Sequence, residues 1–435
     1  MLYHLYEWLK DNSVFKGLRL FQDISFRAIA AIILSLVISA IVGKFIIRRL
    51  SRMQIGESVR ELGLQGEQTK KGTPTMGGII ILLAILIPTL LFANLTNIYV
   101  IILLLTTVWC GAIGFVDDYL KIRAKRIAQK KGEAYKKADA DGLAGRFKIA
   151  GQVSIGIIVG SMLYFNNNVQ SYREFFGTRD QLKQSVNIND TTQVIAKQLD
   201  GKEHLFVKVN KDEPVTTIPF VKSHEFNYAK LLPKSWRGSL TWLLYILVVT
   251  FIITAVSNGA NITDGLDGLA TGVSAIIGAA LGIFVYVGGN FRFAEYLNVL
   301  YIPNMGELSI FMGAFIGACI GFLWYNAYPA QVFMGDTGSL ALGGIIGTLA
   351  IIVKKELLIP VFCGVFFVEN LSVIIQRYYF KYTKKKYGEG RRVFLMAPLH
   401  HHYQKLGYHE SKIAVRFWIV TVLLVVVSVV TLKIR

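Results

Sequence analysis

The fold is decided by residues 239–268, which have the sequence SLTWLLYILVVTFIITAVSNGANITDGLDG. The first part, 239–257, is predominantly apolar and contains no charged residue. A run of about 18 or more such residues is long enough to cross the roughly 30 Å hydrocarbon core of a membrane as a helix. The second part is rich in Asn, Gly and Asp. The pattern therefore predicts a membrane-spanning helix followed by a polar, carboxylate-bearing segment.

Similar apolar runs recur along almost the whole chain and predict about ten transmembrane helices. Their expected ranges are 25–47, 77–94, 98–117, 147–165, 239–257, 268–288, 308–325, 339–353, 358–379 and 413–432. Only 17% of the residues are charged, whereas soluble domains have about a quarter. We therefore expect an all-α polytopic membrane protein, organised as one integral membrane domain over residues 1–435.

The formal net charge of +19 is concentrated in the segments 48–71, 121–137 and 384–392. If the spans alternate, these segments lie on one side of the membrane, and the positive-inside rule makes that side cytoplasmic. This distribution favours a membrane protein over a nucleic-acid-binding one. Both termini are then expected on the outer side.

Residues 166–238 interrupt the series of apolar runs with a long polar segment. Stretches such as HLFVKV, residues 204–209, alternate between apolar and polar side chains. Because such alternation is typical of strands, we expect a small β-containing insertion here, on the extracytoplasmic side. No phosphate-binding loop or dinucleotide fingerprint occurs in the sequence, so any nucleotide site must be built in another way.

Asp117 and Asp118 directly follow the third apolar run. Carboxylates at the end of a span are costly unless they are paired, solvated or bound to a metal, and oxygen ligands suit Mg²⁺. These two residues alone are equally compatible with a helix end whose acids face Lys121 and Arg123.

The segment 258–268 joins two apolar runs and contains Asn261, Asp264 and Asp267. Asp264 and Asp267 stand three residues apart, so one helical turn would place both on the same face. A plain turn needs Gly and Asn but not this density of acids. We therefore expect these three side chains to contact a ligand.

A further polar segment, 326–339, contains Asn326, Phe333 and Asp336 just before another apolar run. A carboxylate beside an aromatic ring suits a metal-bound phosphate and a nucleobase, although an aromatic residue at a span end also packs without any ligand.

Two more motifs are suited to phosphate. Residues 398–403 contain His400, His401 and His402, which are adjacent and so cannot converge on one zinc ion; contact with phosphate or proton handling is the better interpretation. Residues 70–78, KKGTPTMGG, place Lys70, Thr75 and glycine amides at the start of a span, where a phosphate is readily bound.

Taken in order, KKGTPTMGG, the Asp-Asp pair, NITDGLDGL, FMGDTGSL and PLHHH resemble the bacterial phospho-N-acetylmuramoyl-pentapeptide transferases. This family belongs to the polyprenyl-phosphate N-acetylhexosamine-1-phosphate transferases. The resemblance spans nearly the whole chain except about 166–238. It also departs at Tyr403 and Gln404, where the family usually has Phe and Glu.

The resemblance implies ten transmembrane helices, a homodimer, a Mg²⁺ cofactor and an active site on the cytoplasmic face. The substrates would be UDP-N-acetylmuramoyl-pentapeptide and undecaprenyl phosphate, a membrane lipid, and the products UMP and lipid I. Asp336 would hold Mg²⁺, and Asp117 and Asp118 would activate the lipid phosphate. The expected substrate-binding residues are Lys70, Thr75, Lys121, Asn261, Asp264, Asp267, Asn326 and Phe333.

Two alternatives remain at this stage. A sister enzyme would transfer N-acetylglucosamine 1-phosphate instead, although the PLHHH and TPTMGG motifs favour the muramoyl-pentapeptide donor. An ion-coupled transporter would need acids at mid-span depth, whereas here they are expected at span ends on one side.

Overall fold

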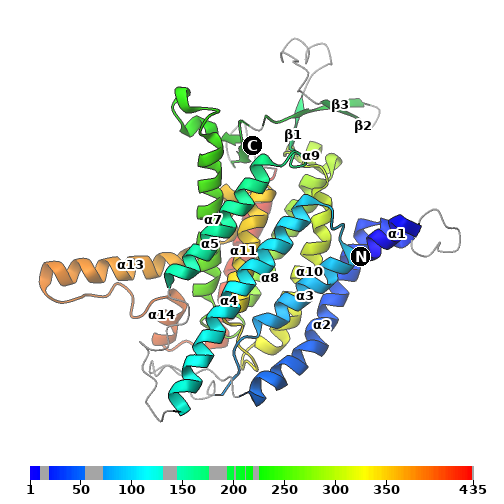
Figure 1. Ribbon diagram of the computed structural model, residues 1–435. Coiled ribbons are helices and arrows are strands. Elements are labelled where there is room, and N and C mark those ends of the chain that lie inside the picture. Colours follow the sequence, from blue (N-terminus) through cyan, green and yellow to red (C-terminus); the bar gives the residue numbers. More distant parts are fainter. Residues whose placement is uncertain are drawn as a thin grey trace.

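The computed structural model describes residues 1–9, 19–53, 72–130, 145–175, 194–199, 202–210, 212–218 and 225–433. Most of these residues form helices that run between the two ends of an elongated bundle (Figure 1). The helices are α1 (Leu2–Leu9), α2 (Ile24–Arg52), α3 (Gly78–Phe92), α4 (Ile98–Lys130), α5 (Gly145–Phe165), α7 (Thr241–Thr263), α8 (Leu269–Gly289), α9 (Phe291–Leu297), α10 (Leu308–Asn326), α11 (Gly335–Ile352), α12 (Ile359–Phe362), α13 (Gly364–Tyr387), α14 (Leu399–Lys405) and α15 (Glu410–Val430).

The described helices confirm a polytopic membrane protein. Within the described ranges, eight helices are long and apolar enough to cross a membrane, namely α2, α4, α5, α7, α8, α10, α11 and α15. The count rises to nine if the bent pair formed by residues 356–362 and α13 is one span, and α3 is a shorter apolar helix. Nine of the ten apolar runs that the sequence singled out therefore lie on one helix each, and the run 358–379 lies on the bent pair.

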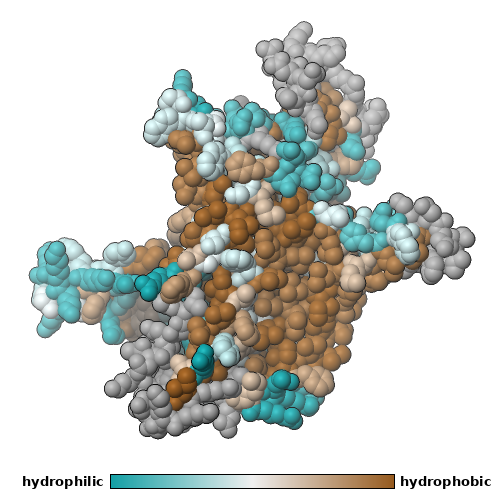
Figure 2. Space-filling view, in the orientation of Figure 1, coloured by the Kyte–Doolittle hydropathy of each residue, from teal (hydrophilic) through white to brown (hydrophobic). Residues whose placement is uncertain are grey.

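The surface has the distribution of polarity that a membrane requires. Figure 2 shows hydrophobic side chains over the middle of the bundle and hydrophilic ones toward its ends. On α2, Ile29, Ile33 and Ile41 are more than half exposed, whereas Ser35 and Ser39 are fully buried. Small residues therefore face the neighbouring helix and large apolar ones face outward, as is typical of helices in lipid.

Helices α2 and α10 approach closely because glycines stand at their contact. A Cβ atom added at Gly321 would lie 2.4 Å from the Ser39 side chain, and one at Gly317 would lie 2.8 Å from the Ile32 carbonyl oxygen. Both distances are below van der Waals contact, so no larger residue fits without moving the helices apart. This is the small-residue packing that holds membrane helices together in the absence of a hydrophobic driving force.

Helix α11 is the most enclosed of the candidate spans and packs against α4 and α7. It confirms the short, Gly-rich run predicted at 339–353. The run at 358–379 is different from a simple span, because the chain bends by 80° between residues 356–362 and α13. Figure 1 shows α13 projecting away from the bundle. The run contains Glu369, which is fully buried and contacts His400 of α14.

The insertion contains two small antiparallel sheets, as the alternating sequence predicted. Strands β1 (Tyr172–Phe175), β2 (Val194–Leu199) and β3 (Lys202–Lys208) pair in the order β1-β3-β2. Strands β4 (Val215–Thr217) and β5 (Glu225–Asn227) form the second sheet. The first sheet lies at the opposite end of the bundle from α14 (Figure 1). It is fixed there by paired backbone hydrogen bonds between Tyr172 and Tyr301, of 2.8 and 2.9 Å.

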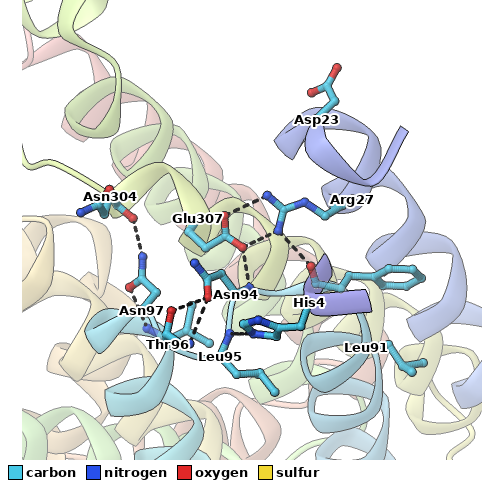
Figure 3. Close-up of polar contacts among 12 residues, drawn as sticks. His4, Asp23, Arg27, Leu91, Asn94, Leu95, Thr96, Asn97, Asn304 and Glu307 are labelled. Carbon is cyan, nitrogen blue, oxygen red and sulfur yellow. Dashed lines mark hydrogen bonds and ion pairs between the residues drawn. The ribbon is translucent and has the colours of Figure 1, made fainter. Parts of the chain in front are cut away.

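A buried ion pair joins α2, the α3–α4 turn and the start of α10 (Figure 3). The Arg27 guanidinium donates to both carboxylate oxygens of Glu307, at 2.5 and 3.0 Å, and to the Phe92 carbonyl oxygen at 3.0 Å. Glu307 also accepts from the Asn94 N–H at 2.6 Å. Because Arg27 is 1% exposed, each charge depends on the other for its solvation.

We expect Glu307→Gln to lower the free energy of unfolding by about 3–5 kcal/mol, since it leaves the buried Arg27 charge uncompensated. The double variant Arg27→Met/Glu307→Met should recover much of the loss, because it removes both charges. The measurement is thermal unfolding in detergent. Asp23→Asn is the matched control, because Asp23 caps the same helix outside this network (Figure 3). Equal unfolding temperatures for Glu307→Gln and Asp23→Asn would contradict the assignment.

Candidate active site

The site is built around the first turn of α11, where Asp118 of α4 binds the backbone. The Asp118 carboxylate accepts hydrogen bonds from the Asp336 N–H at 3.2 Å, from the Thr337 N–H at 2.9 Å and from the Thr337 hydroxyl at 2.6 Å. The first N–H groups of a helix have no partner within the helix, and they carry its positive dipole end. Asp118 therefore satisfies these groups while its own buried charge is solvated.

Gly335 makes this contact possible. Its φ of +72° lies in the left-handed region, and a Cβ atom there would lie 2.6 Å from Asp118 Oδ2 and 3.2 Å from Thr75 Oγ1. The preceding residue pair 333–334 is held by the segment 74–78, with hydrogen bonds of 2.8 Å from Phe333 N–H to the Pro74 oxygen and from Gly77 N–H to the Phe333 oxygen. The Thr75 segment and the Asp336 segment are thus one structural unit.

Asp117 and Asp336 are joined by two lysines. Lys121 Nζ lies 2.6 Å from Asp117 Oδ2 and 3.0 Å from Asp336 Oδ2. Lys148 Nζ, at the start of α5, lies 2.8 Å from Asp117 Oδ2 and also forms an ion pair with Asp336. The Asp117 side chain is fully buried. The two ammonium groups therefore neutralise two carboxylates in a place where bare charges would be costly.

Asn261 completes the surroundings of Asp336. Its amide donates at 2.8 Å to Asp336 Oδ1 and at 2.8 Å to the Ser339 hydroxyl. One oxygen of Asp336 is thus held by Asn261 and the other by lysines. Ligand atoms of Asp117, Asp118 and Asp336 all lie within 4.8 Å of one another. Such a set of carboxylate oxygens has the chemistry that Mg²⁺ prefers.

The histidine motif contacts the same end of the bundle through His400. Its Nδ1 lies 3.1 Å from Glu369 Oε2, and its backbone N–H donates at 3.1 Å to Glu369 Oε1. Its Nε2 faces Gly265, where an added Cβ atom would lie 2.2 Å away. Glu369 of α13 therefore fixes the orientation of a buried imidazole against the segment 258–268.

The other two histidines are partly exposed. His401 Nδ1 lies 2.7 Å from Gln404 Oε1, and His402 Nδ1 accepts a hydrogen bond of 3.1 Å from the Leu395 N–H. Gln404 is one of the two residues that depart from the family motif, and here it orients a ring of that motif.

Asn326 is buried and connects three segments. Its oxygen accepts from the Gly268 N–H at 3.2 Å and from the Thr271 hydroxyl at 2.9 Å, while its amide donates to the Val332 oxygen at 3.0 Å. Asn326 thus fixes the segments 258–268 and 326–339 relative to each other.

Asp267 is also buried and joins the same segments. Its Oδ2 accepts from the Ala330 N–H at 3.0 Å, and its own N–H donates to Glu410 Oε1 at 2.7 Å. Asp264, at the end of α7, and Phe333 are partly exposed. Lys70 lies outside the described residues.

The sequence is similar to known proteins in the part of the chain that forms this site. The sequence model of Glycosyl transferase family 4 matches residues 100–354, and phospho-N-acetylmuramoyl-pentapeptide-transferase signature 1 matches residues 70–82. The chain is 55% identical to the phospho-N-acetylmuramoyl-pentapeptide-transferases of Flavobacterium psychrophilum, over 439 residues, and Flavobacterium johnsoniae, over 437. It is 51% identical to that of Parabacteroides distasonis over 453 residues, and each match covers the whole of both chains.

The chain belongs to the phospho-N-acetylmuramoyl-pentapeptide-transferase family. It is therefore a transferase enzyme, and the expectation drawn from the motifs is confirmed. The matches to these transferases also cover residues 166–238, which the motif resemblance left out. The transferase signature at 70–82 includes the segment 74–78 that holds residues 333–334 beside Asp336.

For this transferase we expect Gly335→Ala to lower kcat about 100-fold, the loss that a displacement of about 1 Å at a reacting group produces. The added methyl group would displace Asp118 and with it Asp336. Gly388→Ala is the matched control, because Gly388 has a similar φ of +78° but open space where a Cβ atom would lie. Kinetics with both variants, normalised to folded protein, would contradict the assignment if Gly388→Ala lost as much activity.

Proposed function

We propose that this transferase moves the phospho-N-acetylmuramoyl-pentapeptide group from UDP-N-acetylmuramoyl-pentapeptide to undecaprenyl phosphate. The products are lipid I and UMP, and the reaction takes place at the cytoplasmic face of the bacterial inner membrane, in a homodimer, with Mg²⁺. The observation that carries the proposal is the cluster of Asp117, Asp336, Lys121 and Lys148 at one end of an apolar bundle. The names of the relatives support the transferred group.

Both substrates bring phosphate to the membrane surface, and the two lysines suit that charge. An oxygen of the lipid phosphate attacks the β-phosphorus of the nucleotide. The bond from that phosphorus to the bridging oxygen breaks, and UMP leaves with the negative charge. The lipid phosphate is largely ionised near neutral pH, so positioning and charge neutralisation matter more than a strong base. Lys121 and Lys148 supply two positive charges for the phosphate oxygens.

The donor set fits Mg²⁺. Asp117 and Asp336 direct carboxylate oxygens at the same two ammonium groups, which supports a cation site at this point. We assign Asp336 as the metal ligand. Asp117 lies beside it and contacts the same two ammonium groups. When bound there, Mg²⁺ would supply positive charge to phosphate oxygens during transfer.

Asp118 acts in this proposal as a positioning residue. Its carboxylate is engaged by the first turn of α11, so its effect on the lipid phosphate passes through the placement of Asp336. Asn261 holds the other Asp336 oxygen and so restricts the rotation of that carboxylate.

The remaining motif residues form the surroundings of the nucleotide in this proposal. Phe333 offers a ring on which the uracil stacks, and Asp264 lies on the neighbouring segment. Lys70 and Thr75 contact phosphate. Asp267 and Asn326 hold the segments that shape the pocket.

The three histidines differ in exposure, and we propose different roles for them on that basis. His400 is held by Glu369 and supports the segment 258–268 by lying against Gly265. The partly exposed His401 and His402 are our candidates for contact with pyrophosphate.

The decisive assay follows UMP release by detergent-purified protein with a polyprenyl phosphate. We expect release with UDP-N-acetylmuramoyl-pentapeptide, its loss on EDTA treatment or Asp336→Asn substitution, and its recovery on addition of Mg²⁺ to the treated, unsubstituted protein. Release from UDP-N-acetylglucosamine instead would assign the sister activity. Absence of turnover with either nucleotide would contradict the proposal.

Removal of the Lys148 charge tests the part of the site that the sequence did not indicate. We expect Lys148→Gln to lower kcat/KM by about 10–100-fold, because hydrogen bonds to charged groups contribute about 1.5–3 kcal/mol. Arg146→Gln removes a charge from the same turn of α5, where Arg146 lies over Phe147, and should leave turnover nearly unchanged. Equal activity of the two variants would exclude a role for Lys148 in transfer.

A further inference from the structure

A second cluster of ionisable side chains lies at the end of the bundle that carries the β insertion. It consists of Glu174 of β1, His204 of β3 and Glu295 of α9, whose ligand atoms all lie within 4.8 Å of one another. His204 Nδ1 lies 2.8 Å from Glu174 Oε1 and 3.9 Å from Glu295 Oε1. Three segments that are far apart in the sequence thus direct a nitrogen and two carboxylates at one point.

The sheet geometry explains why Glu174 and His204 meet. Glu174 pairs directly with Phe206, which stands two residues after His204 on β3. Residues two apart on a strand share a face, so both ionisable groups lie on the face of Phe206. That face packs on the bundle, with the rings of Phe206 and Tyr301 5.9 Å apart. The cluster therefore lies between the insertion and the membrane domain.

Glu174 is in an unfavourable position without a further ligand. Its side chain is only 4% exposed, and its Oε2 has no hydrogen-bond partner among the residues that the structure describes. A buried carboxylate oxygen without a partner is costly, and such an atom in a native structure calls for an explanation. A bound cation is one of the standard explanations.

The charges around this point are also unbalanced, with negative charge in excess. Two carboxylates face a single imidazole, and burial, together with the Glu295 charge, raises the pKa of Glu174, while the His204 contact lowers it. Lys197 lies opposite His204 on β2, but its ammonium stacks over the Phe291 ring at 5.3 Å. A positive charge at the meeting point would relieve the repulsion.

We propose that Glu174, His204 and Glu295 bind a divalent transition-metal ion of the zinc class, with water as a fourth ligand. An imidazole nitrogen and carboxylate oxygens are ordinary zinc ligands, and the nitrogen favours such an ion over Mg²⁺ or Ca²⁺. Bonds of about 2.1 Å in a tetrahedron place ligand atoms about 3.4 Å apart. The 2.8 Å contact would widen by about 0.6 Å and the 3.9 Å contact would shorten by about 0.5 Å, which side-chain rotation provides.

The bound ion would connect the insertion to the bundle. Glu174 and His204 belong to the insertion and Glu295 to α9, so one ion links two strands to the membrane domain at the end remote from Asp336. This inference is independent of the transferase reaction, because none of its ligands belongs to the candidate active site.

The test measures zinc in the full chain, purified in detergent and stripped with EDTA. The protein is re-equilibrated with Zn²⁺ in excess Mg²⁺, which competes for the carboxylates near Asp336, and bound zinc is then determined by mass spectrometry. We expect about one equivalent per chain, lost in His204→Gln and in Glu174→Gln. Co²⁺ in place of Zn²⁺ should give visible absorption bands that disappear in the same variants.

Two matched controls separate this site from others. His409→Asn removes an exposed histidine and keeps a side chain that caps α15, and Glu225→Gln removes a carboxylate of the insertion that pairs with Arg173. Both should retain the zinc. Transferase activity reports folding, and Glu295→Gln replaces any variant that fails to fold. Absence of bound zinc in the unchanged chain, or equal zinc in His204→Gln and His409→Asn, would overturn the proposal.

Discussion

The contact between the Asp118 carboxylate and the first turn of α11 is the interaction on which the site depends. Asp118 and Thr337 are buried within the protein, so water solvates neither the carboxylate nor the free N–H groups of the helix start, and each must satisfy the other. The contact fixes the position of Asp336 relative to Asp117 on α4. Gly335 and the segment 74–78 then have a common purpose, which is to let the α11 terminus come this close.

The same requirement explains why charges occur in compensated groups at both ends of the bundle. Arg27 and Glu307 hold α2 to α10 near the insertion, and two aspartates with two lysines hold α4, α5 and α11 at the other end. In the first group, the Arg27 guanidinium and the Glu307 carboxylate neutralise each other. The second is partly exposed and presents two ammonium groups, and this difference separates a structural ion pair from a site suited to anionic substrates.

Much of this arrangement follows from the sequence, because the length of apolar runs and the position of acids at their ends are local features. They predicted the helices and the β insertion, whereas the grouping of Asp117, Asp336, Lys121 and Asn261 was expected only from the resemblance of the motifs to a known family. Lys148 was missed because a single lysine at the start of an apolar run is indistinguishable from a membrane anchor. Glu369 was missed because it lies inside a run predicted as a span, and only the bend before α13 brings it to His400. Asn326 has the expected location, but its buried hydrogen bonds depend on tertiary packing.

The two lysines that join Asp117 and Asp336 give the proposed reaction the character of an ion exchange. Lys121 and Lys148 have carboxylate partners, so a phosphate that binds as we propose would not add a bare charge to an apolar surrounding. It would take over the ammonium groups, and the carboxylates would become available to a divalent cation. The cluster would then stay close to electroneutral, and the cost of desolvating charged substrates would be spread over partners that exchange with one another.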